Sequence, residues 1–382
     1  MATRVRFHIV VTTDTLGGMT EFDALIARLG LNELDGHKYL GPLGRGAQGQ
    51  VCRYERPDGG EVAVKLLVAP TDPYAVKRFE AEAQALLDIA KVGLEGTIVR
   101  GLTPVRKVPD LPVFYFMMEK ASGQPLSSRI DSSRPPWPWR SAVETLWRVA
   151  TALAPAHVRT VVHRDLHPGN VMIHDETYRT PARIEDMVPC ATILDLGVHR
   201  YSLAPFAGEL TEPPPTFRPV GSVRYASPEA LNDPESVTPR SDVWALGTML
   251  YVMLTGAVPF EAPTLRGLAD IKAAGRARPR AAATDASDAE DQMLNDLLHT
   301  MLNPRSDARP DASDVRNMCG DALLHSLAES FAASAGFRSL YLSKHGRVGL
   351  CVYCKGVAGR NGVRCEACGY ADDEYLHWSH GS

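Results

Sequence analysis

The sequence contains no apolar run long enough to cross a membrane. Its longest candidate, Val243 to Phe260, includes a tryptophan, two glycines and a proline, so it predicts a buried helix instead of a membrane span. The net charge is only −4, which gives the chain no general attraction for nucleic acid. We find no secretion signal and no internal repeat. We therefore expect a cytoplasmic protein that binds neither membranes nor nucleic acids.

Cysteine is also scarce, and four of the seven cysteines lie near the C-terminus. Cys351 and Cys354 form one C-x-x-C pair, and Cys365 and Cys368 form a second pair after ten intervening residues. Four thiolates in a tetrahedral array suit a closed structural Zn²⁺ site, and the segment resembles a zinc ribbon. Because it is too small to bury its own core, metal binding would supply much of its folding free energy. Two disulfides or a redox pair are the alternative, which the missing secretion signal disfavours.

The most informative motif occupies residues 163–170, with the sequence HRDLHPGN. It places Asp165 and Asn170 five positions apart in a loop that contains a proline and a glycine. Phosphoryl transfer requires a carboxylate that orients the attacking hydroxyl and an amide oxygen that helps to hold a metal ion on the phosphates. This pair therefore predicts a phosphotransferase.

A glycine-rich segment precedes this motif, with the sequence GRGAQGQV. It contains Gly44, Gly46 and Gly49, and glycines are needed where a backbone closes over phosphates without a Cβ in the way. The flanking residues 39–41 and 51–54 predict the two strands of a hairpin. Glycine-rich turns without ligands are common, so this pattern alone leaves both interpretations open.

Lys65 lies inside the apolar run 61–67, which predicts a strand. A lysine is costly to bury unless it is paired, and a phosphate together with a carboxylate would pair it. Residues 75–90 contain neither Gly nor Pro and predict a helix. Glu82 lies on the apolar side of that helix, whereas Glu80 points elsewhere by helical phase. We therefore expect Glu82 to pair with Lys65; a solvated helix residue is the alternative.

Together these motifs resemble those of protein kinases. The glycine-rich segment matches G-x-G-x-x-G-x-V, and residues 163–170 match the catalytic loop H-R-D-L-x-x-x-N. Further elements follow in the kinase order: VAVK at 62–65, DLG at 195–197, GSVRY at 221–225, SPE at 227–229, DVWALG at 242–247 and Arg309. Over residues 37–326 the chain is identified as a member of the bacterial, eukaryotic-like Ser/Thr protein kinases. The resemblance implies an α+β, two-lobed protein-kinase fold, with a small β-rich N-lobe and a larger helical C-lobe.

The resemblance also implies ATP-dependent transfer of the γ-phosphate to Ser or Thr hydroxyls of protein substrates. Lys65, paired with Glu82, would contact the α- and β-phosphates, and Asp165 would be the catalytic base. Asn170 and Asp195 would hold Mg²⁺ or Mn²⁺. The residues implied to surround the nucleotide are Leu43, Gly44, Gly46, Gly49, Val51, Ala63, Lys65, Met118 behind the adenine, and Glu119 and Ala121, whose backbones would bond its edge. Arg309 would pair with Glu229.

Several features depart from the family pattern. His167 stands where Ser/Thr kinases usually carry a lysine on the transferring phosphate, which would weaken that contact and add pH sensitivity. Residues 174–190 are a surplus that predicts a surface hairpin loop. Thr211 and Thr216 lie in a proline-containing segment that favours exposure, and a phosphate on either could pair with Arg164; a mobile loop without phosphate is the alternative.

Two other functions remain open. A loop of the form H-x-D-L-H-P-G-N also occurs in kinase-like enzymes that phosphorylate small molecules, although Arg164 and the SPE and GSVRY elements favour a protein substrate. A pseudokinase scaffold would normally have lost Lys65, Asp165 or Asp195, and all three are present.

The chain therefore divides into four predicted parts. Residues 1–36 form an N-terminal extension with a strand and a helix, 37–326 the kinase domain, 327–348 a linker and 349–382 the zinc-ribbon-like segment. The last part carries balanced charge and so lacks the basic surface of a nucleic-acid binder. We expect this segment or the extension to contact a regulatory protein.

Overall fold

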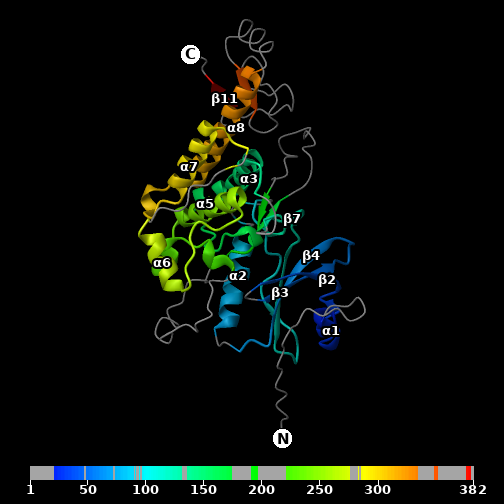
Figure 1. Ribbon diagram of the computed structural model, residues 1–382. Helices are drawn as coiled ribbons and strands as arrows, with labels where there is room; N and C mark the ends of the chain where they lie inside the picture. The colour runs from blue at the N-terminus through cyan, green and yellow to red at the C-terminus, as the bar shows by residue number, and fades with distance from the viewer. Residues whose placement is uncertain are drawn as a thin grey trace. The chain divides into compact units, whose positions relative to one another are not determined.

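The computed structural model describes residues 21–46, 49–71, 74–89, 91, 94, 97–130, 136–173, 191–196, 221–275, 283, 285–333, 348–351 and 376–379. The chain falls into two compact units. The first includes residues up to Lys91 together with Val99–Lys120, and the second includes Val92–Ile98 and the chain from Ala121 onward. The first is rich in strands and the second is mainly helical (Figure 1). The predicted α+β architecture is therefore confirmed.

A six-stranded antiparallel sheet forms the centre of the first unit, in the order β1-β2-β3-β4-β6-β5. Its strands span Glu33–Leu34 (β1), His37–Gly46 (β2), Gly49–Glu55 (β3), Glu61–Val68 (β4), Arg106–Lys107 (β5) and Val113–Glu119 (β6). The predicted glycine-rich hairpin is formed by β2 and β3, whose last paired residues are Gly46 and Gly49. It therefore extends further toward the glycine-rich tip than the sequence indicated.

The described residues of this unit include two α-helices, α1 (Glu21–Arg28) and α2 (Ala75–Ile89). Phe79, Ala83 and Leu86 of α2 are buried, so one side of the helix faces the core, as the spacing of these residues predicts. The expected helix over residues 75–90 is confirmed to within one residue.

The segment that precedes the kinase motifs is part of the same core. Ile26, Leu31 and Leu34 are buried in one cluster with residues of β3, β4 and β6. The hydroxyl of Tyr54 on β3 donates a hydrogen bond of 2.7 Å to the carbonyl oxygen of Leu31. The described part of the extension, from residue 21, therefore stabilises the sheet. The strand expected before it lies outside the described residues.

The second unit contains six described helices and a small sheet. The helices are α3 (Trp139–Val158), α4 (Pro228–Asn232), α5 (Pro239–Thr255), α6 (Leu265–Ala273), α7 (Asp288–Met301) and α8 (Ala312–Ala333). The sheet pairs β7 (Gln124–Pro125), β8 (Val171–Ile173) and β9 (Ala191–Ile193) in that order, with antiparallel neighbours. Two short 3₁₀ helices, η3 (Pro168–Asn170) and η5 (Gly221–Arg224), carry residues of the predicted site.

Helix α5 is the buried element around which this unit packs. It is buried from Ser241 to Leu254, which confirms the expected buried helix. A Cβ on Gly247 would lie 2.9 Å from the Cβ of Met301, so a glycine is needed for the close approach of α5 and α7. Gly256 ends the helix in the left-handed conformation, with φ of 72°, a common way to cap a helix C-terminus.

Only two strands of the zinc-ribbon-like segment are described. They are β10 (Val348–Cys351) and β11 (Leu376–Ser379), which pair antiparallel. Cys354, Cys365 and Cys368 lie outside the described residues, as does the side chain of Cys351. Within the described part of the chain there is no cluster of His, Cys, Asp or Glu able to hold a metal ion. The predicted zinc site therefore stays a prediction.

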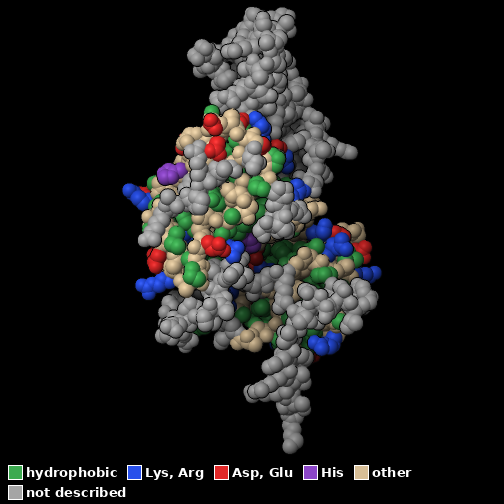
Figure 2. All heavy atoms as spheres, in the orientation of Figure 1, with side chains coloured by type: hydrophobic (Ala, Val, Ile, Leu, Met, Phe, Trp, Pro, Cys, Tyr) green, Lys and Arg blue, Asp and Glu red, His purple; other side chains and the backbone are tan. Residues whose placement is uncertain are grey.

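The surface adds two observations. No helix in the described ranges is both long and apolar enough to span a bilayer. On the face shown in Figure 2, basic and acidic side chains are interspersed among hydrophobic ones, in keeping with the small net charge.

The packing of α1 generates a stability prediction. Replacing the fully buried Ile26 with Ala should lower the free energy of unfolding by about 2–5 kcal/mol, because it leaves a cavity beneath the sheet. Urea denaturation measures this quantity. The matched control is Ala27→Ser on the exposed side of the same helix, which should change it by less than about 0.5 kcal/mol. Equal effects of the two substitutions would show that α1 does not belong to the core.

Candidate active site

Lys65 and Glu82 form a buried ion pair within the first unit. Lys65 lies on β4 and Glu82 on α2, and each residue is only 3% exposed. The lysine ammonium contacts Oε1 of Glu82 directly, while Glu80 is exposed. The pairing predicted from helical phase is confirmed. Breaking such a pair leaves an uncompensated buried charge, which is strongly destabilising.

The glycine-rich hairpin lies beside this lysine. Val51 on β3 is paired with Lys65, and Gln50 is paired with Leu66. A Cβ on Gly49, whose φ is 151°, would lie only 2.5 Å from the carbonyl oxygen of Leu66. Gly49 is therefore required by the close approach of β4, a reason independent of any phosphate. Residues 47 and 48 at the tip lie outside the described residues.

Other predicted nucleotide residues also lie on this sheet. Ala63 and Met118 are directly opposite each other on β4 and β6. Glu119, which follows Met118, is held twice by Arg100: its N–H donates to the Arg100 carbonyl oxygen at 2.9 Å, and its carboxylate accepts from the guanidinium at 2.6 Å. Leu43 is 47% exposed, so it has apolar surface available to a ligand.

The catalytic-loop motif is fixed by one carboxylate of α5. Oδ2 of Asp242 accepts a hydrogen bond of 2.8 Å from the His163 N–H, and Oδ1 accepts one of 2.9 Å from the Arg164 N–H. The His157 ring lies 2.9 Å from the same Oδ2 through its Nε2. Arg164 has a φ of 68°, which is unfavourable for a residue with a side chain. Asp242 therefore stabilises a strained turn immediately before Asp165.

Within this loop Asp165 and Asn170 are in contact. The Asn170 amide donates to the Asp165 carbonyl oxygen at 3.0 Å and lies 3.5 Å from its Oδ2. The Asp165 N–H donates to Nδ1 of His163 at 3.2 Å. Asp165 is only 6% exposed, so these neighbours limit its movement. Because Asn170 uses its amino group here, its Oδ1 is the atom suited to a metal ion.

Strand β9 is joined to the same loop. The Leu194 N–H donates to the Asn170 carbonyl oxygen at 2.8 Å, and the His163 ring lies 2.7 Å from the Leu194 carbonyl oxygen. Asp195 follows directly in the left-handed conformation, with φ of 46°. Asn170 and Asp195, the two predicted metal ligands, are 25 positions apart in the sequence. The bond between Asn170 and Leu194 brings their backbones close together.

His167 has a role that the sequence did not reveal. Its Nδ1 accepts a hydrogen bond of 3.0 Å from the Gly169 N–H and so caps η3. In the neutral ring the proton must then lie on Nε2, which is 3.6 Å from Oδ2 of Asp165. The ring therefore faces the predicted catalytic base instead of being only a shortened substitute for lysine.

The predicted pairing of Glu229 with Arg309 is also confirmed. The buried guanidinium donates to both carboxylate oxygens, at 2.6 and 2.8 Å, and its carbon lies 4.9 Å from the centre of the Trp244 ring. Ser241 donates to the same carboxylate at 2.7 Å. Burial acts to raise the pKa of Glu229, but the hydrogen bonds and charge of Arg309 outweigh it and lower that pKa.

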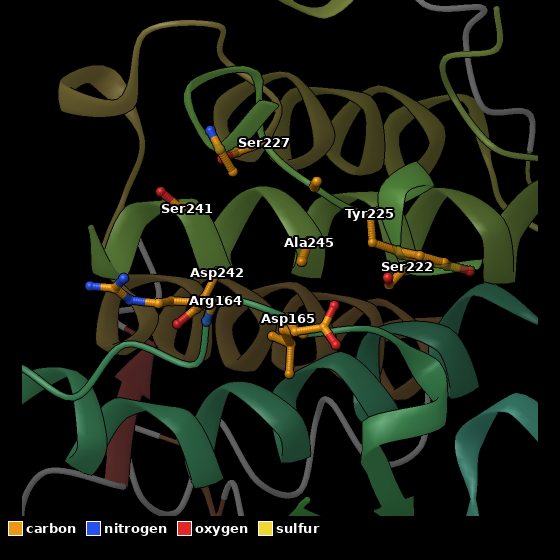
Figure 3. A pocket seen from close by; sticks show the side chains of 11 residues that line it. Arg164, Asp165, Ser222, Tyr225, Ser227, Ser241, Asp242 and Ala245 are labelled. Carbon is orange, nitrogen blue, oxygen red and sulfur yellow. The ribbon is translucent and has the colours of Figure 1, made fainter. Parts of the chain in front are cut away.

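A small cavity of about 10 Å³ connects the catalytic loop to the segment before this glutamate. It is large enough for about one water molecule. Asp165 lines it together with Ser222 and Tyr225. Figure 3 shows the Asp165 carboxylate pointing toward these two residues, whereas the Arg164 side chain extends away from them. The predicted acid therefore faces the GSVRY segment. The insertion 174–190 and the two candidate phosphorylation sites, Thr211 and Thr216, lie outside the described residues.

Comparison with known proteins gives a consistent result. A family model, the protein kinase domain, matches residues 37–319. The serine/threonine-protein kinase Pkn1 of Myxococcus xanthus is 33% identical over 225 residues, which cover 57% of this chain and 28% of Pkn1. PknB of Mycolicibacterium smegmatis is 32% identical over 52% of this chain and 29% of its own length. PkaB of Streptomyces coelicolor is 34% identical over 57% and 48%. The chain spans less than half the length of each relative.

The contacts of Asp242 generate a second stability prediction. Asp242→Asn retains the shape of the side chain but replaces an acceptor oxygen with an amino group that faces a donor. We expect the free energy of unfolding to fall by about 1–3 kcal/mol, because a buried N–H is left unsatisfied. Thermal or urea unfolding measures the loss. Asp270→Asn on the exposed side of α6 is the control, and it should lose less than about 0.5 kcal/mol. No difference between the two variants would show that the three contacts do not hold the loop.

Proposed function

The chain belongs to the protein kinase family, and from this membership we propose that it transfers the γ-phosphate of ATP to Ser or Thr hydroxyls of protein substrates. The observation that carries the proposal is the arrangement of Asp165, Asn170 and Asp195 around one hydrogen-bonded loop. Catalysis of phosphoryl transfer consists largely of positioning and charge stabilisation, and fixed backbone contacts of this kind supply the positioning. Autophosphorylation is included in the proposal.

We assign the binding of ATP to the residues that the kinase motifs imply. Lys65 neutralises the α- and β-phosphates, and Glu82 keeps its ammonium in place. Ala63, Met118 and the backbones of Glu119 and Ala121 contact the adenine. The further nucleotide contacts are Leu43, Gly44, Gly46, Gly49 and Val51.

The donor set of the second unit fits a magnesium ion. Mg²⁺ prefers oxygen ligands and is commonly held by one or two carboxylates together with substrate phosphates. The carboxylate of Asp195 and the Oδ1 of Asn170 supply such oxygens. When bound, the ion would neutralise charge on the phosphates. The contact of Asn170 with Asp165 would then couple the ligand set to the catalytic base.

Asp165 orients the attacking hydroxyl and accepts its proton. Its backbone N–H is fixed by His163 and its carbonyl oxygen by Asn170, so that the carboxylate is held without a large reorganisation during reaction. His167 stands at the position of the usual phosphate-contacting lysine. Its Nε2–H can serve the transferring phosphate only as a shorter donor than a lysine ammonium would be.

A protein substrate is favoured over a small molecule by the segment that Asp165 faces. Ser222 and Tyr225 line the same cavity as the catalytic acid, and the Glu229–Arg309 pair holds the end of that segment. Thr211 or Thr216 is our proposed site of autophosphorylation, with Arg164 as the partner of the phosphate.

We further propose a structural Zn²⁺ in the C-terminal segment. The four thiolates of Cys351, Cys354, Cys365 and Cys368 are the ligand type and spacing that zinc prefers. Such a module, or the N-terminal extension, would contact a regulatory protein.

A kinase assay with labelled ATP, magnesium and a generic basic protein tests the main proposal. Asp165→Asn should lower kcat by about 100-fold to 10,000-fold, because the proton acceptor is lost. Lys65→Met should lower kcat/KM by at least about 100-fold through lost phosphate contacts. The control is Glu80→Gln, an exposed change on the helix that carries Glu82, which should remain within about twofold of wild type.

Each result of this assay has a defined meaning. Label on protein that disappears in Asp165→Asn supports the proposal, and mass spectrometry of that protein locates any phosphate on Thr211 or Thr216. Label found only on a small metabolite would instead indicate a small-molecule kinase, and no transfer at all would indicate a scaffold. Activity that survives both substitutions would refute the assigned roles.

Metal analysis tests the zinc proposal independently. The purified protein should contain about one zinc ion per chain, and Cys365→Ser should lose most of it because three thiolates bind zinc less tightly than four. Cys319→Ala, a buried cysteine of the second unit, should retain the zinc of the wild type. A metal-free wild-type protein, or unchanged zinc in Cys365→Ser, would exclude the site.

A further inference from the structure

Lys272 on α6 is a buried cation that no step of the proposed reaction uses. Its exposed fraction is 0%, although lysine is almost never fully buried without a partner. Arg266 and Asp270 on the same helix are exposed in the usual way. A position that would ordinarily take an apolar side chain therefore carries an ammonium group, and this calls for a specific reason.

The ammonium group is bound by backbone carbonyls of the GSVRY segment and the residue after it. Nζ donates to the carbonyl oxygens of Val223 at 3.3 Å, Arg224 at 3.0 Å and Ala226 at 2.6 Å. An ammonium has three N–H donors, so three acceptors match its full capacity. The Trp244 ring centre lies 5.9 Å away and adds a weaker attraction.

Few other charges act on this ammonium. On α4, Glu229 is the acidic group that influences it, and the carboxylate of that residue is already engaged by Arg309 and Ser241. Arg224 accepts a hydrogen bond from this ammonium through its carbonyl oxygen, and its guanidinium lies 3.7 Å from the carboxylate of the exposed Glu261. On α5 the facing group is the uncharged ring of Trp244, and Asp270 on α6 itself is exposed. The carbonyl oxygens are therefore the main partners of Lys272.

The anchored segment is the one that faces the catalytic acid. It consists of the single short 3₁₀ helix η5 and the two residues after it, and Ser222, Tyr225 and Ala226 from it line the cavity shared with Asp165. Such a short helix has little stability of its own. Its shape must therefore come from contacts with neighbouring elements.

We propose that Lys272 is a positioning residue for the protein substrate: by binding three carbonyl oxygens it holds residues 223–226 in the shape that receives the substrate chain beside Asp165. The inference rests on the proposed protein kinase function. Lys272 does not touch the reacting atoms, so it should govern binding of the protein substrate and leave binding of ATP unaffected.

The protonation state of Lys272 supplies a signature of this role. Burial lowers the pKa of Lys272 to about 7, and the charge of Glu229 acts against this shift. An ammonium donates three N–H bonds, whereas the neutral amine donates two and turns a lone pair toward the third carbonyl. The anchor is therefore complete below about pH 7 and weakens as the pH rises above it.

The kinetic test compares Lys272→Met, which keeps the length of the side chain without donors, with Arg266→Met on the exposed side of α6. In Lys272→Met the KM for a protein substrate should rise by at least about tenfold, while the KM for ATP stays within about twofold of wild type. The ratio of the KM for protein substrate in Lys272→Met to that in the wild type should be largest below about pH 7 and should fall as the pH rises. Arg266→Met should leave both constants within about twofold of wild type. The inference would be overturned if Lys272→Met and the wild type had equal KM values for the protein substrate, or if the KM for ATP rose in the variant by the same factor.

Hydrogen exchange of the full chain separates failure of the anchor from failure of the proposed function, since it requires no activity. Lys272→Met should speed exchange at the amides of Tyr225 and Ala226, which are bonded within the segment, but not in α2. If Lys272→Met does not fold, Lys272→Gln takes its place. This variant has two N–H donors and no charge, and it should also speed exchange at these two amides relative to the wild type. Unchanged exchange in the folded variant would refute the anchor. If this segment is protected in a wild-type protein that phosphorylates nothing, the anchor stands, but the kinase function and the substrate-positioning role are both refuted.

Discussion

The hydrogen bonds accepted by the Asp242 carboxylate hold the candidate active site together. It lies on the buried helix α5 and accepts hydrogen bonds from the His163 and Arg164 backbones, while the His157 ring lies within hydrogen-bonding distance. A carboxylate can accept several bonds at once and is stabilised in an apolar interior only when it does so. The strained backbone at Arg164 persists because these contacts hold it. The positions of Asp165 and Asn170, and through Leu194 that of Asp195, then follow from the hydrogen bonds that continue from this turn.

The same principle recurs at three other buried charges. Lys65 is satisfied by Glu82, Arg309 by Glu229 and Lys272 by backbone carbonyl oxygens. Buried ionic contacts contribute little net stability compared with apolar residues of similar size, but breaking one leaves a charge uncompensated. Their value here is geometric, because each permits one arrangement of the segments it joins. The sheet, the catalytic loop and the GSVRY segment are each fixed in this way.

Much of this organisation could be predicted from the sequence. An apolar run located β4, a stretch without Gly or Pro located α2, and helical phase selected Glu82 over Glu80 as the partner of Lys65. The motif resemblance added the Glu229–Arg309 pair.

Such patterns report which side of an element is apolar, but they do not identify the donor that meets a given acceptor. The contacts of Asp242, the capping of η3 by His167, the burial of Lys272 and the packing of α1 against the sheet depend on tertiary neighbours, and no local pattern contains them. Gly49 is a further example. The sequence indicated that this glycine leaves room for phosphates, whereas the structure shows that it also avoids a clash with the carbonyl oxygen of Leu66.

Hydrogen exchange at two backbone amides shows whether Asp242 holds the catalytic loop. In the wild-type protein, the N–H groups of His163 and Arg164 donate hydrogen bonds to Asp242 on the buried helix α5. We therefore expect hydrogen exchange followed by NMR to show that these two amides open only with global unfolding. Exchange at the rate of exposed loop amides would show instead that the catalytic loop opens independently of α5 and that Asp242 does not hold it.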